Sequence, residues 1–388
     1  MAKHMKKSEN ILKRAFSAIK GAAVPMSDLE GVNLPDGSSM SGFKSGMKKF
    51  VHYEGKLGTF DYDPSEWRVD KGDESKGKSE RFMYIGFETN GSKIHIPEGV
   101  KDLSWTFSGR VRERAINPAP EIPDGVEVCN YTFASSDIQF APEFPDSVKS
   151  MQGTFNGCYN LEQCMTSLPP FVENVSDLFG GCSKLKYCNF DLHSNIKDCS
   201  SMFAGCQSLQ TTPDMIPDTV EKCSGMFNGC SSLAVLGNPF RDLVTGSDFY
   251  PKNVESLSHM FHGCRSLMEV PPFPSNGSLK NLDYVCASCT SLRVPNEIPH
   301  GVIRCERAYA YDTALQKAVS IPESAEPGHF GEVYLYSSVE EEGKKYISDH
   351  INRLKSKGFY KNSLQSERKQ IDVSSVEQTD EQSVEFGA

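Results

Sequence analysis

The sequence predicts a repeat solenoid for residues 97–316: a right-handed coil of short strands and short helical turns. Three observations predict it. A unit of 24 residues recurs, apolar residues hold the same places in nine consecutive units, and all 13 cysteines fall on those places. A unit with only a few apolar residues cannot bury them alone, whereas stacked units bury them against one another in a continuous core.

The repeat is most visible where a phenylalanine lies three residues before a cysteine. Segments such as MFAGCQSL and MFNGCSSL place phenylalanines at 155, 179, 203, 227 and 261, which are 24, 24, 24 and 34 residues apart. We number each unit so that this phenylalanine is position 8. Position 1 is then aliphatic in all nine units: Val100, Val126, Val148, Val172, Ile196, Val220, Val254, Leu279 and Val302.

Further apolar positions follow at 4, 11, 14 and 17, and a proline precedes position 1 by three residues in most units. Proline suits a corner of the coil because it fixes φ and removes a hydrogen-bond donor. The spacing of the apolar positions fits neither strict alternation nor a long helix. It indicates short strands and one helical or 3₁₀ turn at M-F-x-G-C, where the glycine relieves crowding.

The cysteines are predicted to be packing residues, because a free cysteine behaves as a small buried hydrophobe. Cys286 and Cys289 have the C-x-x-C form of a redox or metal pair, but both occupy core positions. His259 and His262 are interpreted as exposed polar residues because they lack an acidic or cysteine partner at ligand spacing. No catalytic motif is found, so we expect no catalytic, metal or cofactor residues.

The run IPDTVEKCSGMFNGCSSL (216–233) resembles the BspA-like leucine-rich repeats of bacteria, and the resemblance covers about 220 residues. The segments GTFDYDPSEW and GFETNGSKIHIPEGV resemble leaders of repeat proteins from gut bacteria and their mobile elements. The resemblance implies a leucine-rich-repeat-like coil and a surface or interaction protein. The chain departs from that pattern at its end units, where Arg110, Ser136 and Asp312 replace the cysteine, as caps often do.

Residues 1–47 are predicted to be an amphipathic helix followed by a linker. Ile11, Leu12, Phe16 and Ile19 form one stripe over 8–24. The helix either docks on the solenoid or acts as an interfacial or partner-binding arm. Basic residues interrupt its apolar stretch, so it does not fit a secretory signal. We therefore expect a cytoplasmic protein with reduced cysteines.

Caps are predicted at both ends of the solenoid. Residues 48–96 are expected to form a β-rich N-terminal cap with strands in FVHYEG, GTFDYD, RFMYIGFE and KIHI and a loop over 70–80. Residues 317–361 are expected to form a C-terminal cap with a last strand and a helix over 339–359. Residues 362–388 are expected to be disordered because polar residues dominate there.

The one long unit carries about ten extra residues within 237–250 (GNPFRDLVTGSDFY). Long loops on regular scaffolds are often functional. Arg241, Asp248, Phe249 and Tyr250 are residue types of binding hot spots or their rims, and they are the predicted partner-binding residues. The alternative is a tolerated insertion.

These features predict a non-catalytic protein-binding module that uses the solenoid face and the long loop. The alternative is a structural assembly component of a mobile element or particle that docks through its N-terminal helix. Net charge is −10 and the pI is about 5.5, which disfavours a nucleic-acid partner. The sequence contains no run of eighteen apolar residues, so no transmembrane segment is predicted.

Overall fold

The structure is a computed structural model that describes residues 50–164, 167–188, 190–237 and 249–357. The chain divides into two compact units. One comprises residues 1–52 and 62–64, of which the structure describes only 50–52 and 62–64. The other comprises residues 53–61 and 65–388 and holds the repeats. The predicted N-terminal helix, the linker and the C-terminal tail lie outside the described residues.

Four short strands precede the repeats. β1 (Val51–Gly55) pairs with β2 (Gly58–Tyr62), and β3 (Trp67–Asp70) pairs antiparallel with β4 (Arg81–Tyr84). β3 was not predicted as a strand, and the predicted strand KIHI is absent. A 3₁₀ turn, η4 (Gly91–Lys93), precedes this segment and ends at its first residue; the Asn90 side chain accepts the Ser92 N–H and stabilises the turn.

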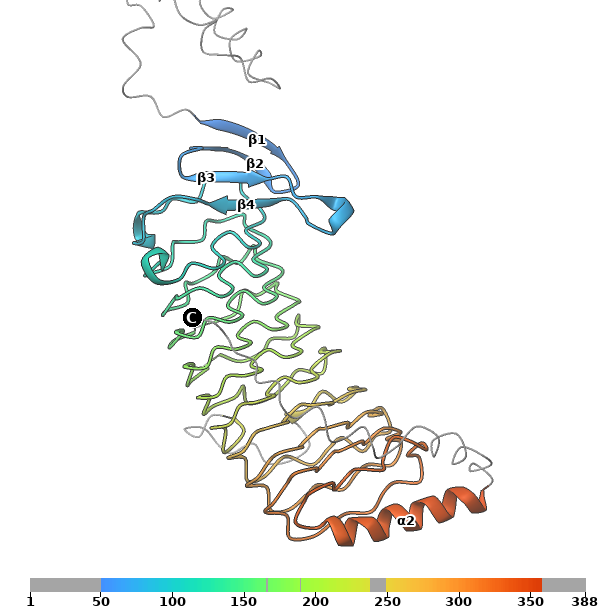
Figure 1. Cartoon of the computed structure of the whole chain (residues 1–388). Helices are drawn as coiled ribbons and strands as arrows, with labels where there is room; N and C mark the ends of the chain where they lie inside the picture. The colour runs from blue at the N-terminus through green and yellow to red at the C-terminus, as the bar shows by residue number, and fades with distance from the viewer. Residues whose placement is uncertain (1–49, 165–166, 189, 238–248, 358–388) are drawn as a thin grey trace, which may run out of the picture. The chain divides into compact units, whose positions relative to one another are not determined.

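β3 and β4 pack on the first coil (Figure 1). The Tyr84 N–H donates to the carbonyl of Thr106 at 3.2 Å. Trp67 stacks on Phe82 at 4.7 Å and meets Phe107 edge-on at 5.9 Å. Because Phe107 is the first ring of the position 8 column, Trp67 covers the end of the aromatic core.

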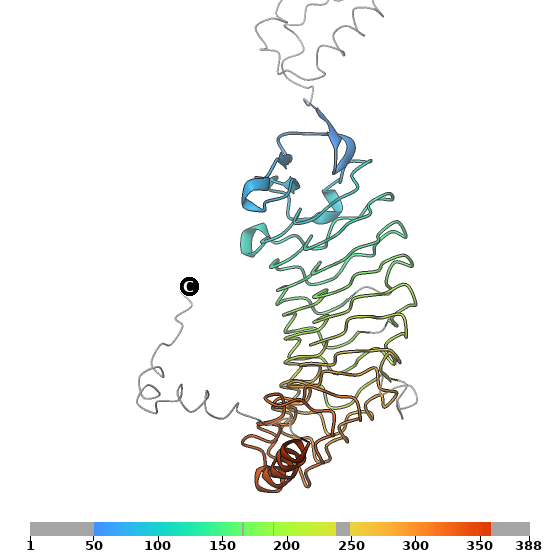
Figure 2. The ribbon, with the colours of Figure 1, turned by 90° about the vertical axis from the view of Figure 1, so that its right-hand side faces the viewer.

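The coils of residues 97–316 stack in register, as Figures 1 and 2 show. Seven phenylalanines at position 8, from Phe107 to Phe261, are buried. Neighbouring rings lie 5.4–6.0 Å apart between centroids and within 14° of parallel. The position 8 column is therefore the continuous core that the repeat predicts.

The backbone of the coils differs from the expected strands and helical turn. Among the described residues of the coils, parallel pairing consists of isolated single-residue bridges, most of them at position 3, such as Asn174 to Asp198. The residues at positions 6 and 10 adopt positive φ in all nine units. Cys199, Ser201, Phe203 and Gly205 donate their N–H groups to the next coil, at 2.6–2.9 Å.

The alternate N–H groups, at positions 7, 9 and 11, donate within the same coil to the carbonyl three residues earlier. The N–H group at position 5 donates to a side chain instead; for example, the Ser200 N–H donates to Asp198 Oδ1 at 3.0 Å. This alternation satisfies the buried backbone without continuous strands or a helix.

The segment after Leu315 was predicted as a last strand but forms a tenth coil. Tyr309 donates its N–H to the carbonyl of Val333 at 2.9 Å, and Tyr334 stacks on Tyr309 at 5.9 Å and 10°. Tyr336 has a φ of 54°, like position 10 of the other units. A two-residue insertion after Glu326 explains why the sequence spacing did not show this coil.

The predicted C-terminal helix is present as α2 (Glu340–Ser356). His350 and Leu354 are buried, while Tyr346, Ile347 and Ile351 are half-buried. The His350 ring hydrogen-bonds through Nε2 to the carbonyl of Ala325 at 3.0 Å and packs edge-on against Phe330 at 4.6 Å. α2 thus packs against the tenth coil, at the opposite end of the stack from β3 and β4 (Figure 1).

Candidate interaction surface

Two of the four predicted partner-binding residues lie in the core. Phe249 and Tyr250 are 0% and 1% exposed. Phe249 packs against Phe227 with ring centroids 6.4 Å apart, and Tyr250 donates its hydroxyl to the carbonyl of Pro271 at 3.3 Å. The long unit re-enters the stack at these two residues, so neither ring presents surface to a partner in this structure.

The other two predicted residues, Arg241 and Asp248, lie outside the described residues. The flanks of the insertion are anchored: Gly237 donates its N–H to Thr212 Oγ1 at 2.6 Å, and Ile216 donates its N–H to the carbonyl of Phe249 at 3.0 Å. A binding role for the loop between these anchors stays a prediction.

The cysteines are core residues with a role that the sequence did not reveal. Twelve of the thirteen are buried, and Cys164 is half-buried. Each of the six thiols at position 11 donates to the position 8 carbonyl of the preceding unit, with Sγ–O distances of 3.0–3.1 Å. The thiol therefore links adjacent coils as well as filling space.

Burial makes these thiols poor nucleophiles and poor metal ligands. It raises the pKa of Cys158 to about 11 and the pKa of Cys182 well above its usual range. Cys286 and Cys289 of the C-x-x-C sequence are fully buried too, and burial raises the pKa of Cys286. Within the described ranges, no three His, Cys, Asp or Glu side chains are grouped as a metal site requires.

The substitutes for cysteine in the end units are buried polar groups. The Arg110 guanidinium donates to the carbonyls of Tyr84 and Gly86 and lies 4.9 Å from the Tyr84 ring centroid. Asp312 accepts the Cys289 N–H at 2.6 Å, and its Oδ2 is buried without a hydrogen-bond partner among the described residues. Burial raises the pKa of Asp312 to about 9, so this side chain is neutral at pH 7.

Position 6 carries the most informative side chains that reach the surface: Trp105 is 37% exposed, and the other bulky residues there are half-buried. Every unit adopts positive φ there, and two units use the expected glycine, Gly153 and Gly225. Other units place bulky residues at the same point, although a side chain in left-handed conformation costs roughly 1–2 kcal/mol. These are Trp105, Tyr131, His259, Tyr284 and Arg307, with φ values of 51–63°.

The bulky position 6 side chains form two clusters. In the N-terminal cluster, Trp105 stacks on Tyr131 at 4.5 Å and 12°. The other side of the Tyr131 ring covers Gly153, where an added Cβ would lie 2.3 Å from a ring carbon. Gly153 is therefore required by its neighbour, since other units accept larger residues at a similar φ.

The C-terminal cluster is built on Tyr284. His259 stacks on one face of its ring at 4.7 Å and 13°, and the Arg307 guanidinium lies over the ring at 5.7 Å from its centroid. His262 meets Tyr284 edge-on at 6.3 Å. Both histidines are half-buried, and burial lowers the pKa of each, so they are not the exposed polar residues that the sequence suggested.

Two tyrosines at position 10 of the last coils extend this cluster. Tyr311 and Tyr336 are 42% and 63% exposed, lie 5.3 Å apart, and also adopt positive φ. Units 3 to 7 have glycine at this position. We call the surface formed by positions 3, 5 and 6 of the nine units, together with Tyr311 and Tyr336, the aromatic face.

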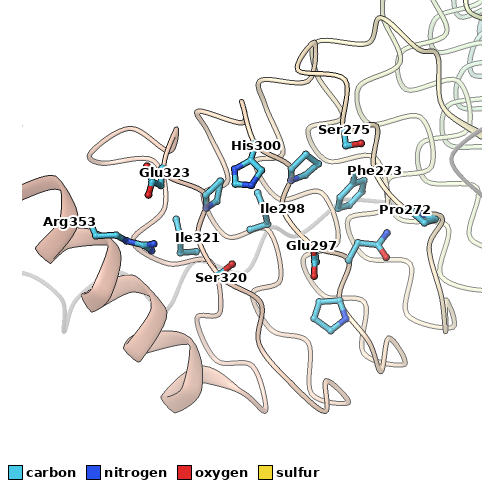
Figure 3. Close-up of a pocket in the computed structure, with 14 residues that line it drawn as sticks. Pro272, Phe273, Ser275, Glu297, Ile298, His300, Ser320, Ile321, Glu323 and Arg353 are labelled. Atoms are coloured by element: carbon cyan, nitrogen blue, oxygen red, sulfur yellow. The ribbon is translucent and has the colours of Figure 1, made fainter. Parts of the chain in front are cut away.

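A groove lies elsewhere, beside the prolines that precede position 1 in the last coils (Figure 3). It has a volume of about 730 Å³ and is lined by Phe273, Ile298, Ile321 and other residues. Arg353 extends into it from α2. Its lining mixes acidic, basic and apolar side chains and contains no group arranged for catalysis.

The stacked coils and their continuous aromatic core define this protein as a repeat solenoid. No helix in the described part of the chain has the length and apolar character needed to cross a membrane. A family model described as "Mycoplasma protein of unknown function, DUF285" matches residues 144–216 and 173–271, which is less than half of the chain. No curated protein matches the chain.

Several solved structures resemble it. A leucine-rich repeat protein of T. pallidum is 19% identical, with 60% of this chain and 90% of that chain covered and a TM-score of 0.37. One from Eubacterium ventriosum is 18% identical, with 62% and 69% covered and a TM-score of 0.39. The pneumococcal vaccine antigen PcpA is 17% identical, with 73% and 72% covered and a TM-score of 0.41.

Proposed function

We propose that this protein is a non-catalytic module that binds a protein partner through the aromatic face. The observation that carries the proposal is the set of bulky side chains at positive φ at position 6. Gly153 and Gly225 show that the coil accepts glycine at this position, so the fold does not require Trp105, Tyr131 or Tyr284 there. Backbone strain of this kind is retained where a function uses it.

The composition of the face supports a protein partner. Tryptophan, tyrosine and arginine are the residues most enriched at the energetic centres of protein interfaces. The face contains one residue of each type whose side chain is already fixed: Trp105 and Tyr284 by stacking, and Arg307 by an ion pair. Little side-chain entropy is therefore lost on binding. The two clusters lie at opposite ends of one column, so a single partner could contact both.

Two further parts of the proposal rest on the sequence. We include the long loop, through Arg241 and Asp248, as a second contact region. We also assign the repeat to the BspA-like type and the protein to a reducing compartment such as the cytoplasm. Thirteen free cysteines favour such a compartment.

The proposal is tested by affinity capture from the source organism, with mass spectrometry to identify retained proteins. The full chain is compared with the double variant Tyr131→Gly/Tyr284→Gly, which removes one ring from each cluster and leaves a residue that tolerates positive φ. A partner that binds the wild-type chain and is lost with the double variant supports the proposal.

The matched control is Tyr159→Gly/Tyr187→Gly, because both of these tyrosines are exposed (62% and 45%) but lie outside the aromatic face. A partner retained equally by all three proteins would show that the aromatic face is not the binding surface. Loss with the control alone would locate the surface elsewhere on the coil.

A further inference from the structure

The charges of the aromatic face do not balance. Positions 3, 5 and 6 of the nine units carry five carboxylates (Asp102, Asp177, Asp198, Asp283 and Glu306) and three basic side chains (Lys222, Arg304 and Arg307). All three basic groups are in ion pairs. Lys222 lies 3.9 Å from Asp198, Arg304 lies 2.6 Å from Asp283, and Arg307 pairs with Glu332.

Three carboxylates of the face therefore have no ion pair among the described residues: Asp102, Asp177 and Glu306. Asp177 and Glu306 are in addition held in an unfavourable environment. Burial, together with the neighbouring Asp198, raises the pKa of Asp177, and burial, together with Glu332, raises the pKa of Glu306. A cation bound beside either group would relieve this effect.

The central rings of the face are not free to stack on a ligand. Tyr131 lies between Trp105 and Gly153, and Tyr284 lies between His259 and Arg307. Sugars and nucleic-acid bases bind aromatic side chains through the ring faces, and an acidic surface repels phosphates. The ring edges that remain carry positive partial charge, and the hydroxyl groups can donate a hydrogen bond, so both suit carbonyl oxygens.

We propose that the occupant of the aromatic face is a basic, extended segment of a protein. Its backbone carbonyls lie against the ring edges and hydroxyl groups of Tyr131 and Tyr284, and its lysine or arginine side chains pair with Asp102, Asp177 and Glu306. This inference rests on the proposed function and names the chemical class of the partner.

The spacing of the carboxylates sets the length of this segment. They lie in units 1, 4 and 9, and neighbouring coils are joined by backbone hydrogen bonds throughout. At roughly 4.8 Å per coil the eight steps from unit 1 to unit 9 span about 38 Å, which about 12 residues of extended chain cover at roughly 3.3 Å each.

The test is fluorescence anisotropy of the full chain with three labelled peptides of matched length. Each contains four repeats, of Gly-Arg-Ser, Gly-Gln-Ser or Gly-Glu-Ser. The arginine peptide is expected to bind, to bind less tightly as salt is added, and to exceed the other two peptides by about tenfold or more in affinity. Equal binding of the three peptides, or binding of none, would overturn the proposal.

Charge-removing variants locate the site. Asp177→Asn/Glu306→Gln is expected to weaken the arginine peptide by about tenfold, because two favourable charge pairs are removed. The matched control is Asp146→Asn/Glu297→Gln, which removes two exposed carboxylates outside positions 3, 5 and 6. Equal weakening by both double variants would mean that net charge alone attracts the peptide, and would overturn the proposal.

Failure of this inference can be distinguished from failure of the proposed function. If affinity capture finds a partner that requires Tyr131 and Tyr284 while the arginine peptide does not bind, the face is an interaction surface but its partner is not a basic segment. If a labelled oligonucleotide or oligosaccharide binds in place of the peptides, the assigned partner class is wrong.

Discussion

Cys206 donates its thiol hydrogen to the carbonyl oxygen of Phe179, one unit earlier, with an Sγ–O distance of 3.0 Å. The same carbonyl already accepts the backbone N–H of Cys182 at 3.0 Å. One carbonyl therefore receives one hydrogen bond from its own coil and one from the next. This arrangement recurs at six units and explains why the column uses cysteine rather than alanine or valine.

Replacing Cys206 with alanine is expected to lower the free energy of unfolding by about 1–3 kcal/mol. The substitution removes a buried sulfur atom and one hydrogen bond between coils. Chemical denaturation monitored by circular dichroism measures the loss. The control is Cys164→Ala at the half-buried cysteine, for which the expected loss is smaller than about 1 kcal/mol. Equal losses would contradict the role assigned to the thiol at position 11.

Thiol reactivity is expected to separate Cys164 from the other twelve cysteines. Burial raises the pKa of Cys158 to about 11 and the pKa of Cys223 to about 12, and it shields all twelve buried thiols from reagents. Ellman's reagent is expected to modify one thiol rapidly in the native protein and all thirteen after denaturation. Cys164→Ser should abolish the rapid phase. A rapid phase that persists in this variant would show that a position assigned to the core is open to solvent.

The core was predictable because burial repeats in the sequence with the period of the coil. The details that depend on backbone conformation were not. Glycine at position 10 of the central units indicated a turn there, but Trp105 and Tyr131 gave no sign of positive φ at position 6. Phe249 and Tyr250 were interpreted as binding residues because a lengthened unit hides the point where the core pattern resumes.

The proposed interaction surface was predictable from the sequence only as a class. Sequence periodicity marked which positions are apolar and buried, but it did not show which polar and aromatic positions of different coils are neighbours. The stacking of His259 on Tyr284 joins residues 25 positions apart, and the ion pair between Arg304 and Asp283 joins neighbouring coils. Such contacts require the coil geometry, because every unit contributes one residue to each exposed column.

Asp312 is expected to make stability depend on pH. Its pKa is raised from 3.8 to about 9 in the folded chain, so the folded state holds a proton that the unfolded state releases. This contribution to stability is complete below about pH 4 and is lost as the pH rises toward 9. In that range its slope is about −1.4 kcal/mol per pH unit.

The measurement is the free energy of unfolding of the wild-type chain and Asp312→Asn across this range. The difference between the two proteins isolates Asp312 from other groups, and the variant should gain stability relative to wild type as pH rises. Asp349→Asn, an exposed carboxylate on α2, is the control and should follow the wild type. A constant difference between Asp312→Asn and wild type would show that Asp312 does not hold a proton in the folded chain.

Tyr131→Gly is expected to change the free energy of unfolding by less than about 1 kcal/mol. The variant loses the stacking on Trp105, which is worth about 0.5–1.5 kcal/mol. It also relieves a side chain at a φ of 53°, which costs a similar amount. Phe155→Ala in the buried position 8 column serves as the comparison and should lose about 3–5 kcal/mol. If Tyr131→Gly proved as destabilising as Phe155→Ala, Tyr131 would be a structural residue, and its half-buried ring would no longer indicate a binding surface.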